Sequence, residues 1–296
     1  MTTERWGKRY RDTRDWKQYN RRLVTRGEFY VNPRFLDEWL PEIRVMNRRK
    51  VGQPYTYPRS LILFLAVLWS KGFDLRALQG IVQVLSRRLG PFPVISFSQI
   101  RRRILCLPVS FGARWRGGVV SCDGSGIKAG NRGEWIREKW RVRRGWIKVV
   151  IMGDTQGDIV DVQVGDETLD ERAAARGMIR KHGGGIRKVL LDGLHDCQDT
   201  FTLCEHEGID PGIKIRGNAT GKGLGPRARE ARKYKEKGYR RWADGKGYGM
   251  RWPASEGIFS AVKRMFGDGV RSHTAWAMYR ETILKFWVYQ QVREVT

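Results

Sequence analysis

The sequence predicts an α/β fold, with a mixed sheet flanked by helices over residues 119–296, preceded by an all-helical region over residues 1–118. Two observations lead to this prediction. Apolar residues recur at helical spacing in the first part, and short apolar or alternating runs typical of strands begin at Val119. The 296 residues are enough for one large domain or two ordinary ones, each with a substantial core.

The charge balance predicts a nucleic-acid partner. The chain carries 57 Lys and Arg against 31 Asp and Glu, a formal net charge of +26. Self-repulsion of this size opposes compaction unless a polyanion lies against the protein. Phosphates are the expected partner, because each one neutralised by Lys or Arg releases condensed counterions. A role at a membrane surface is not expected, since neither a basic amphipathic helix nor a lipidation signal is evident.

Cysteine usage and hydropathy predict a cytoplasmic protein. The four Cys residues show no framework of spacings typical of disulfides. The charged stretch 1–10 lacks the apolar run of a signal peptide. The longest apolar stretch, 61–69, is far too short to span a membrane.

Within the first part, two helices joined by a Gly/Pro turn at 90–93 favour a helix-turn-helix. The first is amphipathic, with apolar residues at a three-and-four spacing: Leu75, Leu78, Ile81, Val82 and Leu85. Ser96 and Gln99 form a capping-box pair at the start of the second. That helix carries three consecutive basic residues: Arg101, Arg102 and Arg103. The alternative interpretation is a helical hairpin with a solvated basic face.

The second part shows the element order β-β-β-α-β-α-β, which is the layout of a ribonuclease H-like fold. The predicted strands are 119–122, 147–152, 159–164, 188–191 and 211–216, and the predicted helices are 169–181 and 199–207. Residues 153–157 form a hairpin-type turn between the second and third strands. Two further helices, 255–266 and 274–292, close the chain.

A Gly-rich basic stretch, 217–251, interrupts this order and is expected to be a loop that becomes ordered against phosphates. Its basic residues include Arg240 and Arg241, which we expect to bind DNA. The alternative is a disordered loop that only adds solubility.

Carboxylates at strand ends predict the chemistry. Asp123 follows the run 119–122 and Asp192 follows the strand 188–191, and the two strands are neighbours in a ribonuclease H-like sheet. Glu256 lies at the start of the predicted helix 255–266. Phosphodiester cleavage uses two divalent cations roughly 3.5–4 Å apart, which prefer carboxylate oxygens. The alternatives are turn-forming Asp-Gly pairs and a glutamate favoured by a helix dipole.

Several segments resemble a known family. They are 16–20 with 23–24 and 26–27; 75–80 followed by 98–102; 123–126; Gly133, Glu134 and Trp135 with Arg143, Arg144 and Trp146; 191–193; and 251–252 with Glu256, 259–260 and 263–264. In these segments the chain resembles the DDE transposases of bacterial and archaeal insertion sequences, in the group around insertion sequences four and five. The resemblance runs from about Trp16 to Phe266.

The glutamate region departs from the family pattern at one spacing. The family often places Tyr, then Arg three residues later, Glu four later and Lys seven after that. Here Tyr248, Arg251, Glu256 and Lys263 match, except that Arg251 and Glu256 are five apart. Either Trp252 displaces the register, or the arginine belongs to a variant subgroup.

The resemblance implies two-metal phosphoryl transfer with Mg²⁺ or Mn²⁺, two ions per active site. Asp123 would contact both ions, and Asp192 and Glu256 would each complete one. Arg251 and Lys263 would bind phosphates of the flanking strand, and Tyr248 would also bind DNA. Trp252 would stack on an unpaired base, or alternatively belong to the core.

The family's activity also implies partners. The helical region would bind the terminal inverted repeats, and a freed 3′-hydroxyl would be joined to target DNA. A homodimer is expected on DNA, because two ends must be synapsed, and a prokaryotic, nucleoid-associated location follows.

Three other interpretations remain open. His195, Cys197, Cys204 and His206 could form a zinc site, although no C-x-x-C pair is present. The chain could instead be a catalytically inactive, transposase-derived DNA-binding protein. It could also be another ribonuclease H-like nuclease, such as a resolvase.

Overall fold

The computed structural model describes residues 2–5, 8–11, 14–90, 92–129 and 145–295. The chain forms two compact units. The first comprises Met1–Trp69, Phe73–Ile104 and Gln291–Thr296, and the second Ser70–Gly72 and Leu105–Gln290. The main division therefore lies at residue 105, earlier in the chain than the predicted boundary at 118.

The first unit is helical, as predicted. Its helices are α1 (Trp16–Tyr30), α2 (Phe35–Asn47), α3 (Arg59–Ser70), α4 (Leu75–Leu89) and α5 (Phe97–Leu105). Phe35 is fully buried, and its ring centroid lies 5.2 Å from that of Phe64. A short antiparallel hairpin of β1 (Thr2–Arg5) and β2 (Lys8–Arg11) precedes the helices and was not predicted.

The predicted pair of helices around the Gly/Pro turn is confirmed as α4 and α5. Asp74 caps α4, because its side chain accepts a 2.8 Å hydrogen bond from the Ala77 amide. Ser96 plays the same part for α5 by accepting from the Gln99 amide at 3.4 Å. Both helices are therefore capped at their start by a polar side chain that accepts a hydrogen bond from the first turn.

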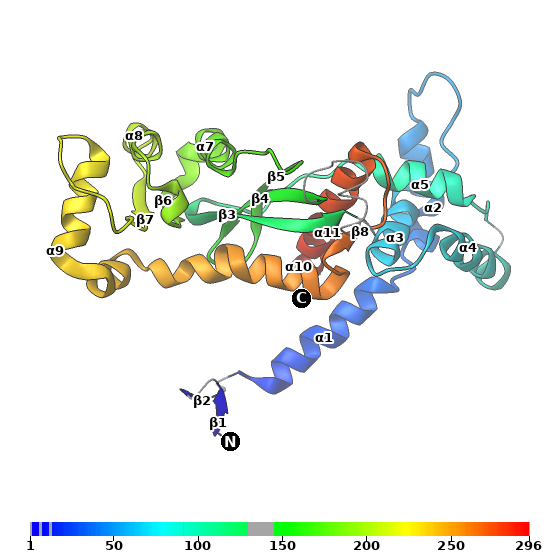
Figure 1. Ribbon diagram of the computed structural model, residues 1–296. Coiled ribbons are helices and arrows are strands. Elements are labelled where there is room, and N and C mark those ends of the chain that lie inside the picture. Colours follow the sequence, from blue (N-terminus) through cyan, green and yellow to red (C-terminus); the bar gives the residue numbers. More distant parts are fainter. Residues whose placement is uncertain (1, 6–7, 12–13, 91, 130–144, 296) are drawn as a thin grey trace. The chain divides into compact units, whose positions relative to one another are not determined.

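The second unit is built on a mixed sheet in the order β5-β4-β3-β6-β7 (Figure 1). The strands are β3 (Gly118–Ala129), β4 (Trp146–Asp154), β5 (Ile159–Gly165), β6 (Ile186–Leu191) and β7 (Asp210–Ile213), and the short β8 (Gly269–Val270) pairs with β3. Neighbours β3, β4 and β5 pair antiparallel, whereas β6 and β7 run parallel to β3. This order and direction confirm the ribonuclease H-like layout.

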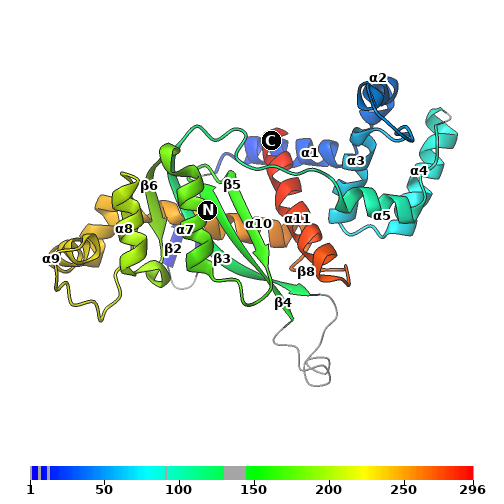
Figure 2. The same cartoon turned by 90° about the horizontal axis from the view of Figure 1, so that it is seen from above.

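Helices cover both faces of this sheet, as Figures 1 and 2 show for α7 (Glu171–His182) and α8 (Gln198–His206) on one side and α10 (Gly257–Phe266) on the other. Side chains of α7 and α8 such as Met178 and Phe201 are fully buried in one cluster with Val120 and Leu191 of the strands. On the opposite face, a methyl group at Gly153 of β4 would collide with the Ala254 carbonyl just before α10.

The basic stretch 217–251 is largely helical, so the prediction of a loop is wrong. Helix α9 spans Pro226–Lys246, with a break at Gly238, whose φ of 71° is left-handed. Lys, Arg, Glu and Ala are good helix formers. The helix also has a buried side: Ala231 is 1% and Trp242 3% exposed. Trp242 packs against Leu190 of the sheet, which supplies the core contact that the charge pattern concealed.

Helix α11 (Ala275–Val295) ends the chain. It includes the predicted helix 274–292 except for its first residue, and extends three residues further. Among the described residues, no helix combines the length and the apolar character needed to cross a membrane.

Candidate active site

Asp123 lies inside β3, so the prediction that it ends a strand is wrong. Strand β3 pairs with β4 as far as Lys128 opposite Trp146, whereas its pairing with β6 stops at Ser121 opposite Leu190. The later antiparallel partner prolongs β3 beyond Asp123. On the β6 side, however, Asp123 lies just past the last pair of residues, at the edge that the prediction required.

Asp192 directly follows β6 and begins the short helix η2 (Gly193–His195). Its Oδ1 atom accepts a 2.9 Å hydrogen bond from the Leu194 amide, which fixes the side chain. Because β3 and β6 are adjacent and parallel, Asp123 and Asp192 come to the same edge of the sheet. Their charges interact, since Asp192 contributes to raising the pKa of Asp123.

Glu256 is linked to Asp123 through Arg251. One guanidinium nitrogen of Arg251, Nη1, lies 3.4 Å from Asp123 Oδ2, and the other, Nη2, donates to Glu256 Oε1. Segment η4 (Trp252–Glu256) is a π-helical turn, in which the Gly257 amide donates to the Trp252 carbonyl five residues back. The wider turn accommodates the five-residue spacing between arginine and glutamate.

Burial and neighbouring carboxylates perturb the site. Burial raises the pKa of Asp123 to about 6, against the opposing effects of Arg251 and the Gly124 amide; Glu171 and Asp192 raise it further. Partly buried carboxylates that repel one another are stabilised by a cation. The donor set of carboxylate oxygens fits a hard divalent ion. Among the described residues, no group of three or more His, Cys, Asp or Glu side chains is placed to hold a metal ion as it stands, and Arg251 bridges two of the predicted ligands, Asp123 and Glu256.

The remaining residues of the glutamate region take different positions. Lys263 Nζ donates a 2.8 Å hydrogen bond to Ser125 Oγ, two residues beyond Asp123, so its charge lies beside the site. Tyr248 is buried, and its hydroxyl donates to the Leu191 carbonyl at 3.0 Å. Trp252 is 60% exposed, so the alternative that it belongs to the core is wrong.

The other predicted DNA-binding residues lie on helices. Arg101 and Arg102 of α5 are exposed, whereas Arg103 is half-buried with its guanidinium 5.2 Å from the ring centroid of Tyr57. On α9, exposed side chains extend from both predicted positions: Arg240 and Arg241. The residues Gly133, Glu134, Trp135, Arg143 and Arg144 lie outside the described part of the chain.

Glu171 and Lys148 lie beside the site and were not predicted from the sequence. Glu171 is in the first turn of α7, and its Oε2 atom lies 3.6 Å from Lys148 Nζ. His195, considered only as a zinc ligand, has Nε2 at 3.9 Å from Glu171 Oε1. Only one feature of the sequence could have pointed to Glu171: it directly follows Asp170, which caps the helix, in a chain that has few carboxylates. The residues of the zinc alternative diverge: Cys204 is buried, whereas His206 is exposed.

The fold and the site together define a ribonuclease H-like domain with an acidic centre at the edge where β3 and β6 meet. Residues 114–290, more than half of the chain, match the family model described as "Transposase DDE domain". The chain belongs to this family and is a DNA transposase by class. Among solved structures, a piggyBac transposase synaptic complex with hairpin DNA is similar at 9% identity and a TM-score of 0.41, over 91% of this chain and 74% of that one. No curated protein matches the sequence.

Proposed function

We propose that this protein is the transposase of an insertion sequence of the four/five group. It binds terminal inverted repeats, cleaves the transposon ends and joins the 3′-hydroxyl to target DNA. One observation carries the proposal: Asp123 lies on β3, Asp192 directly follows the adjacent parallel strand β6, and Arg251 ties Glu256 to Asp123. Three carboxylates from a strand, a strand end and a helix start are the arrangement that two-metal cleavage requires.

In this proposal Asp123, Asp192 and Glu256 hold two Mg²⁺ or Mn²⁺ ions. Such ions, when bound, stabilise the charge on the attacking and leaving oxygens of an in-line displacement. Lys263, oriented by Ser125, binds a phosphate oxygen of the scissile strand. Arg251 directs two nitrogens at the carboxylates of Asp123 and Glu256. With cations neutralising these carboxylates, Arg251 would be free to bind a neighbouring phosphate.

Exposed basic and aromatic side chains supply the DNA contacts. Arg240 and Arg241 on α9 neutralise phosphates, as do Arg101 and Arg102 on α5. Trp252 is exposed enough to stack on an unpaired base. The proposal includes a homodimer on the DNA, because two transposon ends must be paired, and a location at the prokaryotic nucleoid, because the DNA acted on is chromosomal.

The test is cleavage of a labelled duplex that carries the element's own ends, with Mg²⁺ or Mn²⁺. The wild type is compared with Asp192→Asn and with a matched control, Asp199→Asn, which changes an exposed aspartate at the start of α8. We expect metal-dependent nicking at the end in the wild type and the control, and none in Asp192→Asn, with DNA binding retained.

Two other outcomes would redirect the assignment. If every form binds the ends and none cuts with either metal, the chain is an inactive, transposase-derived DNA-binding protein. If cutting occurs but no 3′-end is joined to target DNA, the chain is another ribonuclease H-like nuclease.

A further inference from the structure

A buried histidine lies beside the acidic site. The His195 side chain is 0% exposed, and neither ring nitrogen has a hydrogen-bond partner within the described residues. Its Nε2 atom lies 3.9 Å from Glu171 Oε1. An imidazole ring carries at least one N–H to donate in either protonation state. A buried polar group without a partner is costly, which indicates that the ring has a partner in another state of the site.

Glu171 reaches the sheet through a space that a glycine leaves open. A methyl group built on Gly124 would collide with the Glu171 carboxylate. Gly124 follows Asp123 directly, so the missing side chain brings the α7 carboxylate against the strand that carries Asp123. Electrostatic effects also indicate that these carboxyl groups are near one another. The charge of Asp192 contributes to raising the pKa of both Glu171 and Asp123.

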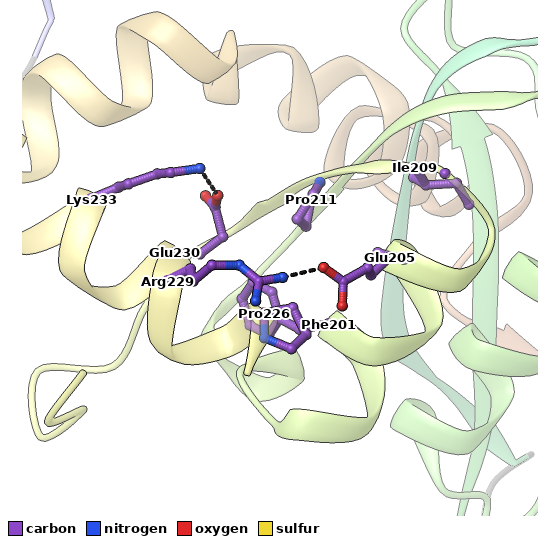
Figure 3. Close-up of a pocket in the computed structure, with 10 residues that line it drawn as sticks. Phe201, Glu205, Ile209, Pro211, Pro226, Arg229, Glu230 and Lys233 are labelled. Atoms are coloured by element: carbon purple, nitrogen blue, oxygen red, sulfur yellow. Dashed lines mark hydrogen bonds and ion pairs between the residues drawn. The ribbon is translucent and has the colours of Figure 1, made fainter. Parts of the chain in front are cut away.

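Glu171 makes a longer ion pair than two other glutamates of this unit, Glu205 and Glu230. A pocket of about 260 Å³ between α8 and α9 is lined by Glu205 and Glu230, and each makes a direct ion pair there: Glu205 with Arg229, and Glu230 with Lys233 at 2.8 Å (Figure 3). Glu171 is also ion-paired, at the longer distance of 3.6 Å between its Oε2 atom and Lys148 Nζ. Its other oxygen, Oε1, lies beside His195 and has no lysine or arginine partner among the described residues, so this oxygen can accept a further cation.

We infer that Glu171 is a fourth carboxylate of the divalent-cation site, beside Asp123 and Asp192, and that His195 is a positioning residue that donates its N–H to Glu171 when a cation is bound. Helix α7 delivers this carboxylate from the face of the sheet opposite to α10. A hydrogen bond from a buried imidazole orients a ligating carboxylate and maintains its ionised form. The inference rests on the proposed two-metal function.

The experiment measures Mn²⁺ binding to the full chain without DNA, by the loss of the free Mn²⁺ signal in electron paramagnetic resonance. Wild type is compared with Glu171→Gln, His195→Phe and their double variant. Glu205→Gln is the matched control, because it removes an already paired carboxylate of the same unit. Asp123→Asn reports on the proposed site itself.

We expect Glu171→Gln to weaken Mn²⁺ binding on the order of tenfold or more, and His195→Phe to weaken it to a similar extent. The double variant should be no weaker than Glu171→Gln, because both changes remove the same ligand. Glu205→Gln should bind like the wild type. If Asp123→Asn weakens binding and Glu171→Gln does not, the inference is overturned and the proposed function stands. If Asp123→Asn also binds like the wild type, the proposed metal site fails as well.

The role of His195 has a separate check. Gln keeps an N–H donor near the position of Nε2, so His195→Gln should retain Mn²⁺ affinity close to that of the wild type. This variant decides the question if His195→Phe fails to fold by circular dichroism. A folded His195→Gln that binds as poorly as Glu171→Gln would overturn the positioning role.

Discussion

The hydroxyl of Tyr248 donates a 3.0 Å hydrogen bond to the carbonyl of Leu191, the residue immediately before Asp192. This bond ties the segment that carries Arg251 to the end of β6. The family resemblance suggested DNA binding for Tyr248, but its side chain is only 8% exposed. Its position supports a different part, in which it holds the strand end that presents Asp192.

Tyr248→Phe should therefore lower stability and leave DNA affinity unchanged. Loss of one buried hydrogen bond costs about 1 kcal/mol in the free energy of unfolding, measurable by urea denaturation. Tyr239→Phe is the control, because Tyr239 is 50% exposed. Weaker binding to the transposon ends with unchanged stability would show instead that Tyr248 contacts DNA.

Asp123 makes stability depend on pH in the metal-free protein. Its folded pKa of about 6 lies above the ordinary value of 3.8, so the folded state binds this proton more tightly than the unfolded state. The contribution of Asp123 to stability is therefore present below pH 3.8 and is lost as the pH rises through 6. In EDTA at pH 7, Asp123→Asn should be more stable than the wild type, by on the order of 1 kcal/mol.

The same comparison has an internal check at low pH. At pH 4 the wild-type carboxyl is already protonated in the folded state, so the advantage of Asp123→Asn should shrink. Asp199→Asn, at an exposed position, should match the wild type at both pH values. An equal stability difference at pH 4 and pH 7 would contradict the assignment of the raised pKa to Asp123.

Replacing either of two tryptophans near the site should have a different effect, on DNA binding for Trp252 and on stability for Trp242. Trp252 is 60% exposed, so Trp252→Ala should change stability little and weaken binding to ends that carry unpaired bases. Trp242 is 3% exposed, and Trp242→Ala should cost roughly 3–5 kcal/mol in the free energy of unfolding. Fluorescence anisotropy on single-stranded and duplex ends, together with thermal melts, measures both. Unchanged affinity of Trp252→Ala for unpaired ends would exclude stacking.

The exposed arginines of α9 should set part of the salt dependence of DNA binding. Each phosphate contact contributes about one to the slope of log affinity against log salt concentration. Replacing Arg240 and Arg241 with Gln should reduce that slope by about 2, without lowering stability, because both side chains are exposed. A slope equal to that of the wild type would place the DNA elsewhere on the protein.

Local patterns predicted the strand order and the adjacent placement of Asp123 and Asp192, because apolar runs and turn residues encode both. The length of β3 was not predictable, since the pairing that prolongs it depends on β4, a strand further along the chain. Helix α9 was not predicted because its many charged residues obscured its apolar side. That side becomes part of a core only by packing against Leu190 and other residues of the sheet.

The parts of the site that depend on packing were also beyond the sequence. Glu171 and His195 are far apart in the chain, and the packing of α7 on the sheet brings them together. The five-residue spacing of Arg251 and Glu256 looked like a departure from the family. A π-turn absorbs it, and such a turn has no simple residue pattern.

Strand β3 carries Asp123 and Ser125 at alternate positions, so both side chains leave the same face, and Ser125 receives Lys263. A slip of one residue against β4 would turn both away together. An error in the pairing of this one strand should therefore inactivate a molecule completely. A preparation with such errors would contain fully active and fully dead molecules, and its specific activity would measure the fraction with correct pairing.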